Sequence, residues 1–299
     1  MLDYAAIEAL SAVIRQGSFE KAARSLNVTS SAVSQRIKGL EEAVGKLLVV
    51  RSQPCRATEA GAALCRHAER VALLEHELKG DMPEIAALRG DDEAPTLRVA
   101  ANADSVATWF VSALAPFAIK QGVLFDVSID DQDHTATMLT NAMVQGAVTT
   151  LKAPVRGCRV VRLGTMRFLA TCSPAFYEKH FPEGVNRNAL RRAPCLLFNS
   201  KDALQRRFVR RLVGAALKAP MHWLPSPQGF VDACVQGMAW GMNPEALVRA
   251  PLEEGRLREL VPGRHLDVEL YWQYWKGSSP LLDELTAAVQ SVAARTLRP

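Results

Sequence analysis

Apolar residues near the N-terminus recur every three or four positions in three short segments, and this spacing predicts three helices that each bury one face. The first segment covers residues 4–16 and ends at Gly17, a residue type that commonly terminates helices. Ser18 caps the second segment, and the third begins near Thr29 or Ser30. The apolar positions of the third segment are Val33, Ile37 and Leu40.

The connections between these segments are typical of a winged helix-turn-helix. Asn27 can take the left-handed conformation that a tight turn between the second and third helices requires. After Gly45, residues 48–51 are prone to form a strand, residues 52–54 to turn, and residues 56–58 lead into another helix. We therefore expect a short two-stranded wing after the third helix.

The polar side of the third helix carries side chains that bind base edges and phosphates in DNA. Eight basic residues and only three acidic ones lie between Arg15 and Arg56, so positive charge is concentrated in this module. The candidate DNA contacts are Ser30, Ser31, Ser34, Gln35, Arg36 and Lys38 on the helix, and Arg51 and Arg56 on the wing. A solvated polar face on an ordinary three-helix bundle is the alternative interpretation.

A long helical pattern follows, from residue 59 to residue 88, and it repeats every seven residues. One seam is Leu64, Val71, Leu78 and Ile85, and the companion seam is His67, Leu74, Asp81 and Leu88. Such a repeat predicts pairing with a second helix, although a helix packed on its own domain is the alternative. Residues 89–95 are polar and break helices, which predicts a hinge.

The remaining two-thirds of the chain alternate between strand-like and helical patterns, which predicts a mainly parallel sheet with helices on both faces. The expected strands are residues 96–101, 124–129, 146–150, 168–172, 195–199 and 268–275. The expected helices are residues 105–120, 135–144, 202–212, 230–235 and 280–297. Sheets of this kind bind small ligands beyond the carboxyl ends of their strands.

Three segments that follow expected strands are candidate ligand sites. In residues 101–105, free backbone N–H groups and the Ser105 hydroxyl can hold a carboxylate. Asp130 and Asp131 can hold a cation, and residues 198–202 can close over the ligand. Because Asp, Asn and Ser are common helix caps, a cap or a solvated loop is the alternative for each segment.

Length and composition limit the number of domains, the state of the cysteines and the cellular compartment. A chain of 299 residues has room for about two domains. Its six cysteines form no CxxC pair, which favours reduced thiols over disulfides or a zinc site. No signal peptide is visible, and no apolar run approaches the ~18 residues that span a bilayer. A soluble, cytoplasmic protein without a membrane partner is therefore expected.

The sequence contains no ordered nucleophile–base set, phosphate loop or metal-ligand spacing. It therefore favours a protein that is not an enzyme and has no metal or cofactor. An enzyme on the same scaffold is one alternative. A redox sensor is another, and it needs two cysteines that the fold brings together, for example Cys158 and Cys172.

The N-terminal residues resemble the signature of the LysR-type transcriptional regulators, in order and without gaps. The matching residues are Gly17, Ser18, Phe19, Ala22, Ala23, Leu26, Ala32, Val33, Ser34, Ile37, Leu40, Glu41, Gly45, Leu48, Arg51, Thr58, Ala60 and Gly61. Val49 departs from the family, which usually has Phe there. The resemblance implies DNA contact by the third helix and phosphate positioning by Ser18 and Arg51, and Thr29 completes the candidate set.

The same resemblance implies a division of the chain into three parts. Residues 1–58 would form an all-α winged helix-turn-helix, and residues 59–89 a linker helix that dimerises. Residues 90–299 would form an effector-binding domain with the two-lobed α/β fold of type 2 periplasmic binding proteins. The expected bounds are about residues 96–167 and 269–299 for lobe I, and about residues 168–268 for lobe II.

Several segments look like the ArgP/LysG branch of this family, which senses lysine and arginine. They are residues 50–59, 102–109, 129–131, 146–148, 181–185 and 270–272. A basic amino acid needs a carboxylate site and acidic partners for its cationic groups, because an unpaired buried charge is costly. The implied effector-binding residues are Asn102, Asp104, Ser105, Thr108, Asp130, Asp131, Thr149, Ser200 and Asp202.

This resemblance implies a sequence-specific regulator of genes for basic amino-acid export or metabolism, with L-lysine or L-arginine as its effector. The implied partners are double-stranded promoter DNA, a second copy of the chain in a homodimer or a dimer of dimers, and RNA polymerase. An origin or nucleoid DNA-binding protein that inhibits replication initiation without a ligand is the alternative.

Overall fold

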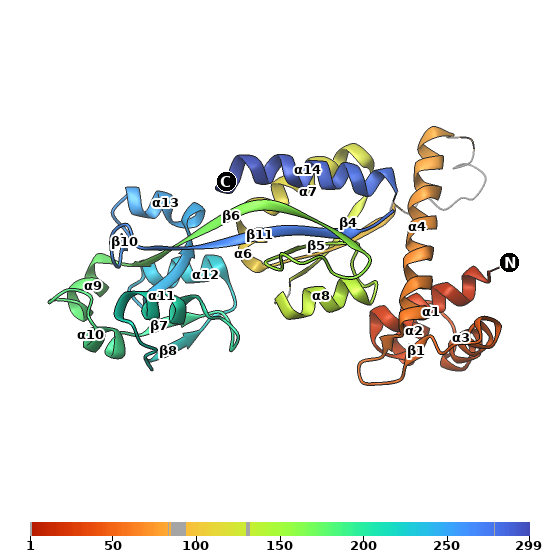
Figure 1. Ribbon diagram of the computed structural model, residues 1–299, viewed down its shortest axis with the longest axis horizontal. Helices are drawn as coiled ribbons and strands as arrows, with labels where there is room; N and C mark the ends of the chain where they lie inside the picture. Colours follow the sequence, from red (N-terminus) through yellow and green to blue (C-terminus); the bar gives the residue numbers. More distant parts are fainter. Residues whose placement is uncertain (1, 83, 85–93, 130–131, 278) are drawn as a thin grey trace. The chain divides into compact units, whose positions relative to one another are not determined.

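The computed structural model of the chain describes residues 2–82, 84, 94–129, 132–277 and 279–299. The chain divides into two compact units, which we call the first and the second unit. The first unit comprises Met1–Ala101, Leu114–Val161 and Trp272–Ala288. The second unit comprises Asn102–Ala113, Arg162–Tyr271 and Val289–Pro299. Figure 1 draws both units and labels most of their helices and strands.

The first unit begins with the expected winged helix-turn-helix. Its helices are α1 (Tyr4–Gln16), α2 (Phe19–Ser25) and α3 (Ser30–Val44), and its wing pairs β1 (Val49–Val50) antiparallel with β2 (Arg56–Ala57). Gly17 ends α1 with a φ of 64°, and Asn27 turns the chain with a φ of 52°. Both are left-handed conformations, so the predicted turn chemistry is confirmed.

The core of this module takes one apolar face from each helix. Ile7 and Leu10 of α1 and Val33 and Ile37 of α3 have no exposed surface. Ala22 of α2 is equally buried, and its small side chain lets the neighbouring helices approach closely. Burial of one large apolar side chain stabilises a fold by ~1.5–3 kcal/mol. The buried face therefore fixes which side of α3 is left for solvent.

The helix α4 (Glu59–Asp81) follows the wing. Cys65 and Leu73 are buried, whereas Leu74 and Leu78 of the predicted seams are 52% and 45% exposed. The helix thus buries one face in its own unit and leaves part of the seven-residue pattern exposed. Ile85 and Leu88 of the predicted seams lie outside the described residues. Most of the predicted hinge lies outside them as well.

Three parallel strands form part of the main sheet: β3 (Thr96–Ala101), β4 (Leu124–Ile129) and β5 (Gly146–Thr149). On one face of these strands lies α8 (Gln132–Thr140), and on the other lie the first-unit parts of α7 (Val111–Gln121) and α14 (Pro280–Thr296) (Figure 1). The strand order is β10-β6-β11-β5-β3-β4. The three strands not yet bounded are β6 (Cys158–Cys172), β10 (Arg258–Glu259) and β11 (His265–Trp275). Residues of β6 and β11 belong to both units.

Glu69 of α4 joins three segments of the first unit. Its carboxylate accepts hydrogen bonds from Arg98 of β3 and Gln145 beside β5, at 2.9 and 3.0 Å, and from Arg15 of α1 at 3.4 Å. Burial first, and then the charge of Arg98, lower the pKa of Arg15. Glu69 therefore holds together two guanidinium groups that would otherwise repel each other.

The second unit contains the other ends of the long strands. β9 (Gly241–Pro244) and β10 each pair antiparallel with β6, and β7 (Cys195–Leu197) pairs in parallel with β8 (Met221–Trp223). Its helices include α9 (Pro174–His180), α10 (Arg187–Arg192), α11 (Leu204–Val213), α12 (Pro227–Val235) and α13 (Glu245–Glu253). Among the described residues of both units, no helix is long and apolar enough to cross a membrane.

The structure corrects several expectations. The main sheet is mixed rather than mainly parallel, because β6 runs antiparallel to β9 and β10. The strand expected at residues 168–172 is only the end of the 15-residue β6. The helix expected at residues 135–144 ends at Thr140, shortly before the left-handed Ala142 with its φ of 59°. The elements that were not expected are α9, α10, α13, β8, β9 and β10.

Two glycines of the winged module make contrasting tests of its packing. A Cβ on Gly61 would lie 2.1 Å from the Leu48 carbonyl oxygen, whereas a Cβ on Gly39 in α3 would meet nothing within 4 Å. We expect Gly61→Ala to lower the free energy of unfolding of this module by about 1–3 kcal/mol. Gly39→Ala should raise it by up to about 1 kcal/mol, because alanine favours a helix. Thermal unfolding followed by circular dichroism measures both, and shifts of the same sign would contradict the described packing.

Candidate functional site

The N-terminus and outer face of α3 carry most of the predicted DNA-binding residues. The hydroxyl of Thr29 caps the helix by accepting the N–H of Ala32 at 3.1 Å. Apart from half-buried Ser34, the other candidates on α3 are exposed: Ser30, Ser31, Gln35, Arg36 and Lys38. Their exposure follows from the burial of the opposite, apolar face of the helix. The structure thus presents polar and basic groups along α3 as the sequence predicts.

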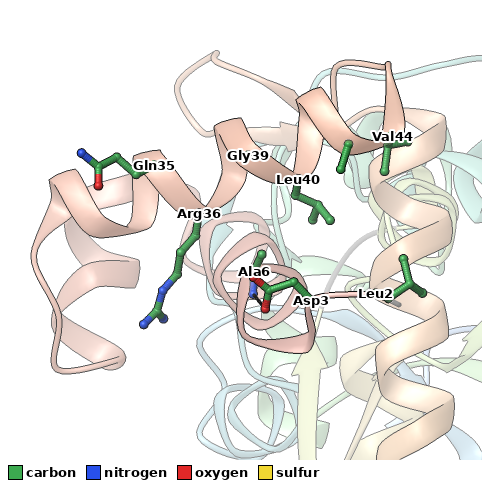
Figure 2. Close-up of a pocket in the computed structure, with 9 residues that line it drawn as sticks. Leu2, Asp3, Ala6, Gln35, Arg36, Gly39, Leu40 and Val44 are labelled. Carbon is green, nitrogen blue, oxygen red and sulfur yellow. Dashed lines mark hydrogen bonds between the residues drawn. The ribbon is translucent and has the colours of Figure 1, made fainter.

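A groove of about 860 Å³ lies between α3 and the start of α1 (Figure 2). Arg36 and Gln35 both line it but leave α3 in different directions. Asp3, on the other side, caps α1 by accepting the N–H of Ala6 at 3.2 Å. Sequence reasoning missed this groove, because it depends on how α1 crosses α3 rather than on any local pattern.

Glu41 holds the wing against α3. Its Oε1 accepts the N–H groups of Leu48 and Val49, at 2.7 and 3.3 Å, where the chain enters the first wing strand. The hydroxyl of Thr58 adds a second tie by donating to the Leu47 carbonyl at 2.8 Å. Glu41 therefore fixes the start of the wing to α3, and Thr58 ties the end of the wing back to its start.

Three further candidates lie beside this wing. Arg51 is exposed, and its guanidinium lies 5.1 Å from the centre of the Phe19 ring, a cation–π contact with α2. Arg56 is also exposed. Ser18 caps α2 and donates its hydroxyl to Glu20 at 2.5 Å, which lowers the pKa of that carboxyl. The Ser18 hydroxyl proton is therefore already used in a hydrogen bond within the chain.

The segment after β3 has an unusual helical start. α6 (Ala103–Ser105) continues into a π-helical turn at Val106–Phe110 and then into α7. Single π-helical turns are frequent at functional sites. Within the described part of the chain, three buried polar atoms here have no hydrogen-bond partner: Asn102 Oδ1, Ser105 Oγ and Trp109 Nε1. Unsatisfied buried polar atoms are costly, which makes this segment a candidate for binding a polar group.

Asp104 and Asp202 form a like-charge pair in the second unit. Burial, and then the neighbouring charge of Asp202, raise the pKa of Asp104 to about 7. The carboxylate of Asp202 is held by the N–H groups of Phe198 and Leu204, each at 3.0 Å. Burial, followed by the same Asp202 charge, raises the pKa of the Cys195 thiol to about 11. The arrangement is strongly acidic, and a cation would stabilise it.

The other predicted effector residues are not all brought to this pair. Thr108 donates its hydroxyl to the Asp104 carbonyl at 2.6 Å, and Ser200 is exposed. Thr149 belongs to the first unit, where its hydroxyl accepts the N–H of Leu151. Two predicted residues lie outside the described residues: Asp130 and Asp131.

Sequence reasoning missed two polar side chains of the second unit. Trp109 and Gln205 are each 2% exposed, and the polar atoms of both lack partners among the described residues. Gln205 carries a readable signal, because it shares the helical spacing of the buried Phe208 and Val209. A polar residue on the apolar face of an amphipathic helix needs a partner.

Cys158 and Cys172, the example of a redox pair, lie too far apart along one strand to form a disulfide. Cys158 and Cys172 are the two ends of β6, a strand of 15 residues. A strand rises about 3.3 Å per residue, whereas the Cα atoms of a disulfide lie within about 7 Å. Burial raises the pKa of Cys158 to about 11 and that of Cys172 to about 12, so neither is a reactive thiolate.

Both parts of the chain match family descriptions. Residues 4–62 match the bacterial regulatory helix-turn-helix protein, lysR family, and residues 90–294 match the LysR substrate binding domain. The chain belongs to the LysR family. It is a DNA-binding transcriptional regulator, and its winged helix-turn-helix and effector-binding domain are those predicted from the sequence.

Individual LysR-family proteins are similar along the whole chain. LysG of Mycobacterium tuberculosis, an HTH-type transcriptional regulator, is 45% identical over 297 residues, which are 99% of this chain and 95% of that protein. The crystal structure of ArgP from Mycobacterium tuberculosis has a TM-score of 0.80 and 43% identity, covering 100% of this chain and 99% of that one. Full-length LysG from Corynebacterium glutamicum with bound effector Arg has a TM-score of 0.76 and 36% identity, covering 100% of both chains. These matches confirm the ArgP/LysG resemblance and favour a regulator over the origin-binding alternative.

The two adjacent glutamates of α3 make a matched test of how this LysR-family module holds its wing. Glu41→Ala removes the acceptor of two N–H groups, so we expect the free energy of unfolding to fall by about 1–3 kcal/mol and DNA affinity to fall with it. Glu42→Ala removes only an exposed carboxylate 3.7 Å from Lys38, and a change below about 0.5 kcal/mol is expected. Urea denaturation and DNA titration measure both, and equal effects would contradict the described role of Glu41.

Proposed function

We propose that this LysR-family regulator takes a basic amino acid, L-lysine or L-arginine, as its effector, and that Asp104 and Asp202 bind a cationic group of that ligand. The acid pair carries this proposal, because in the described part of the chain no cation pairs with either carboxyl. The Arg206 guanidinium donates to the Asp202 carbonyl rather than to its carboxylate. The structure of the Corynebacterium glutamicum relative with bound effector Arg supports the same ligand class.

The polar groups of residues 102–109 suit the α-carboxylate and the α-ammonium group of an amino acid. A carboxylate needs hydrogen-bond donors, and the buried Ser105 hydroxyl and the Trp109 indole N–H are donors without partners among the described residues. Asn102 Oδ1 is an acceptor in the same state and suits an ammonium group. Asp130, Asp131, Thr149 and Ser200 stay in the proposed set on the strength of the family resemblance, whereas the hydroxyl of Thr108 is already engaged.

On the DNA side, we propose that α3 enters the major groove and that the wing contacts the backbone. Ser30, Ser31, Ser34, Gln35, Arg36 and Lys38 would read bases or phosphates, and Ser18, Thr29, Arg51 and Arg56 would position the backbone. The exposed arginines of the wing support this division, because phosphate contacts need accessible charge. The regulated genes would be those for basic amino-acid export or metabolism.

The exposed apolar residues of α4 support self-association. Leu74 and Leu78 of α4 and Met82, its C-cap residue, are 52%, 45% and 46% exposed and recur every four residues. We infer that α4 pairs with the same helix of a second copy, in a homodimer or a dimer of dimers. Such an assembly would act on promoter DNA in the cytoplasm, where RNA polymerase is a further partner.

A salt titration tests the proposed phosphate contact of Arg51. We expect Arg51→Ala to weaken binding to all DNA sequences alike and to reduce the slope of log affinity against log salt by about 1. Arg264→Ala removes an exposed arginine of the second unit and should leave the slope unchanged. Fluorescence anisotropy on DNA from upstream of this gene and on a scrambled duplex measures both. A loss confined to the native sequence would argue against a phosphate contact.

The pH dependence of ligand binding tests the acid pair. With a pKa of about 7, the Asp104 carboxyl of the ligand-free protein is protonated below pH 7, whereas a bound cation favours its ionised form. The affinity for lysine and arginine should therefore rise by up to about tenfold per pH unit between about pH 5 and pH 7, and level off above about pH 8. Isothermal titration calorimetry should also record proton release.

Asp104→Asn should remove this pH dependence and weaken lysine binding by at least about tenfold, because an amide supplies no charge. Asp232→Asn, which changes an exposed side chain bonded to Gln228, is the control and should bind like the wild type. Because the pKa of Asp104 is raised in the fold, its ionisation destabilises the ligand-free protein as the pH rises from about 4 to about 7. Asp104→Asn should therefore melt at a higher temperature at about pH 8. Normal, pH-dependent lysine binding by Asp104→Asn would place the cation elsewhere.

A further inference from the structure

Gln205 is a buried polar side chain of the second unit whose two polar atoms both lack a partner among the described residues. It occupies the first turn of α11, on the face that buries Phe208 and Val209, and it is 2% exposed. The amide offers two N–H donors and an oxygen acceptor, yet neither its Nε2 nor its Oε1 finds a partner in the described part of the chain. A leucine or methionine at this position would avoid that cost, so the fold alone gives no reason for glutamine.

The Gln205 amide is not the only unsatisfied polar group among the described residues of the second unit. Ten buried side-chain nitrogen or oxygen atoms lack a partner among the described residues, and five of them belong to Gln205 and to residues 102–109. The two segments are connected through their acids, because the charge of Asp202, three residues before Gln205, acts on Asp104. Among the described residues of the second unit, five of the seven such atoms therefore belong to the two segments that carry Asp104 and Asp202.

The kinds of atom in this group indicate one class of ligand. Two carboxyls suit cationic groups, but they repel a carboxylate, which must then be bound by donors that are close and well placed. The Gln205 amide and the Trp109 indole are uncharged N–H donors of this kind. In contrast, the arginines of α11 that could supply a charged donor are exposed on its other face: Arg206, Arg207, Arg210 and Arg211.

We propose that the Gln205 amide donates to the α-carboxylate of the bound effector and thereby makes the site selective for amino acids over diamines. This inference rests on the proposed function, since it assigns one more contact at the same site. Binding would satisfy an amide that is unsatisfied in the free protein, so part of the ligand affinity comes from removing an existing cost. Gln205 is then a specificity residue, whereas the acid pair supplies attraction to any cation.

The test compares L-lysine with 1,5-diaminopentane, which lacks the carboxylate, in binding to the full-length wild type, Gln205→Met and Gln205→Leu. We expect both variants to bind lysine about tenfold to a hundredfold more weakly and to lose most of the preference for lysine over the diamine. Both should also unfold at a higher temperature without ligand, because a buried unsatisfied amide is removed. Gln236→Leu, at an exposed position of the same unit, should change neither affinity nor preference.

An unchanged preference for lysine in both variants would overturn the inference. So would a lower unfolding temperature of both ligand-free variants, because it would mean that the amide is satisfied within the fold. Wild-type protein that binds neither lysine nor arginine would overturn the proposed function together with this inference. Normal wild-type binding that depends on Asp104 but not on Gln205 would overturn the inference alone.

Discussion

The charge of Asp202 beside the carboxyl of Asp104 is the constraint on which we propose that the sensing part of this regulator depends. Asp202 is held by two backbone N–H groups at the start of α11, and this fixes where its charge lies. Burial, and then this charge, raise the pKa of Asp104 to about 7, so a nearby cation would favour its ionised form. No such conflict would be needed to stabilise the fold, because apolar residues of similar volume would pack there at lower cost. This cost is the reason for our proposal that a cationic ligand group completes the interaction.

The DNA-binding module follows the opposite principle, since its polar contacts are satisfied within the chain. Thr29 caps α3, Glu41 fixes the wing and Ser18 caps α2, so these three polar groups each have a partner within the module. The candidate DNA contacts left exposed on α3 and the wing are charged, hydroxyl or amide side chains that water solvates readily. A surface that must bind a polyanion reversibly needs this kind of arrangement, because its charges stay hydrated until phosphates replace the water.

Local signals predicted the elements that local chemistry determines. Caps and turns at Gly17, Ser18 and Asn27 located the first helices, and the apolar run at residues 96–101 gave the correct bounds of β3. Elements fixed by distant pairing were missed. β9 has a glycine and a proline, which read as a turn, and it becomes a strand only by pairing with β6. Gln205 was missed because four arginines follow it in α11, so that it looks like one more solvated residue. Its helical spacing from the buried Phe208 and Val209 is the signal that was overlooked.

Charge is divided between the two functions more sharply than the total suggests. The formal net charge of the chain is +5, from 36 basic and 31 acidic residues, and the stretch from Arg15 to Arg56 alone holds eight bases against three acids. The rest of the chain therefore holds 28 of each and is formally neutral. A polyanion is attracted to the N-terminal module and a small cation is not repelled by the remainder. Within that neutral remainder, an acid pair without a counter-charge in the described residues is a local imbalance, and a single bound cation is enough to correct it.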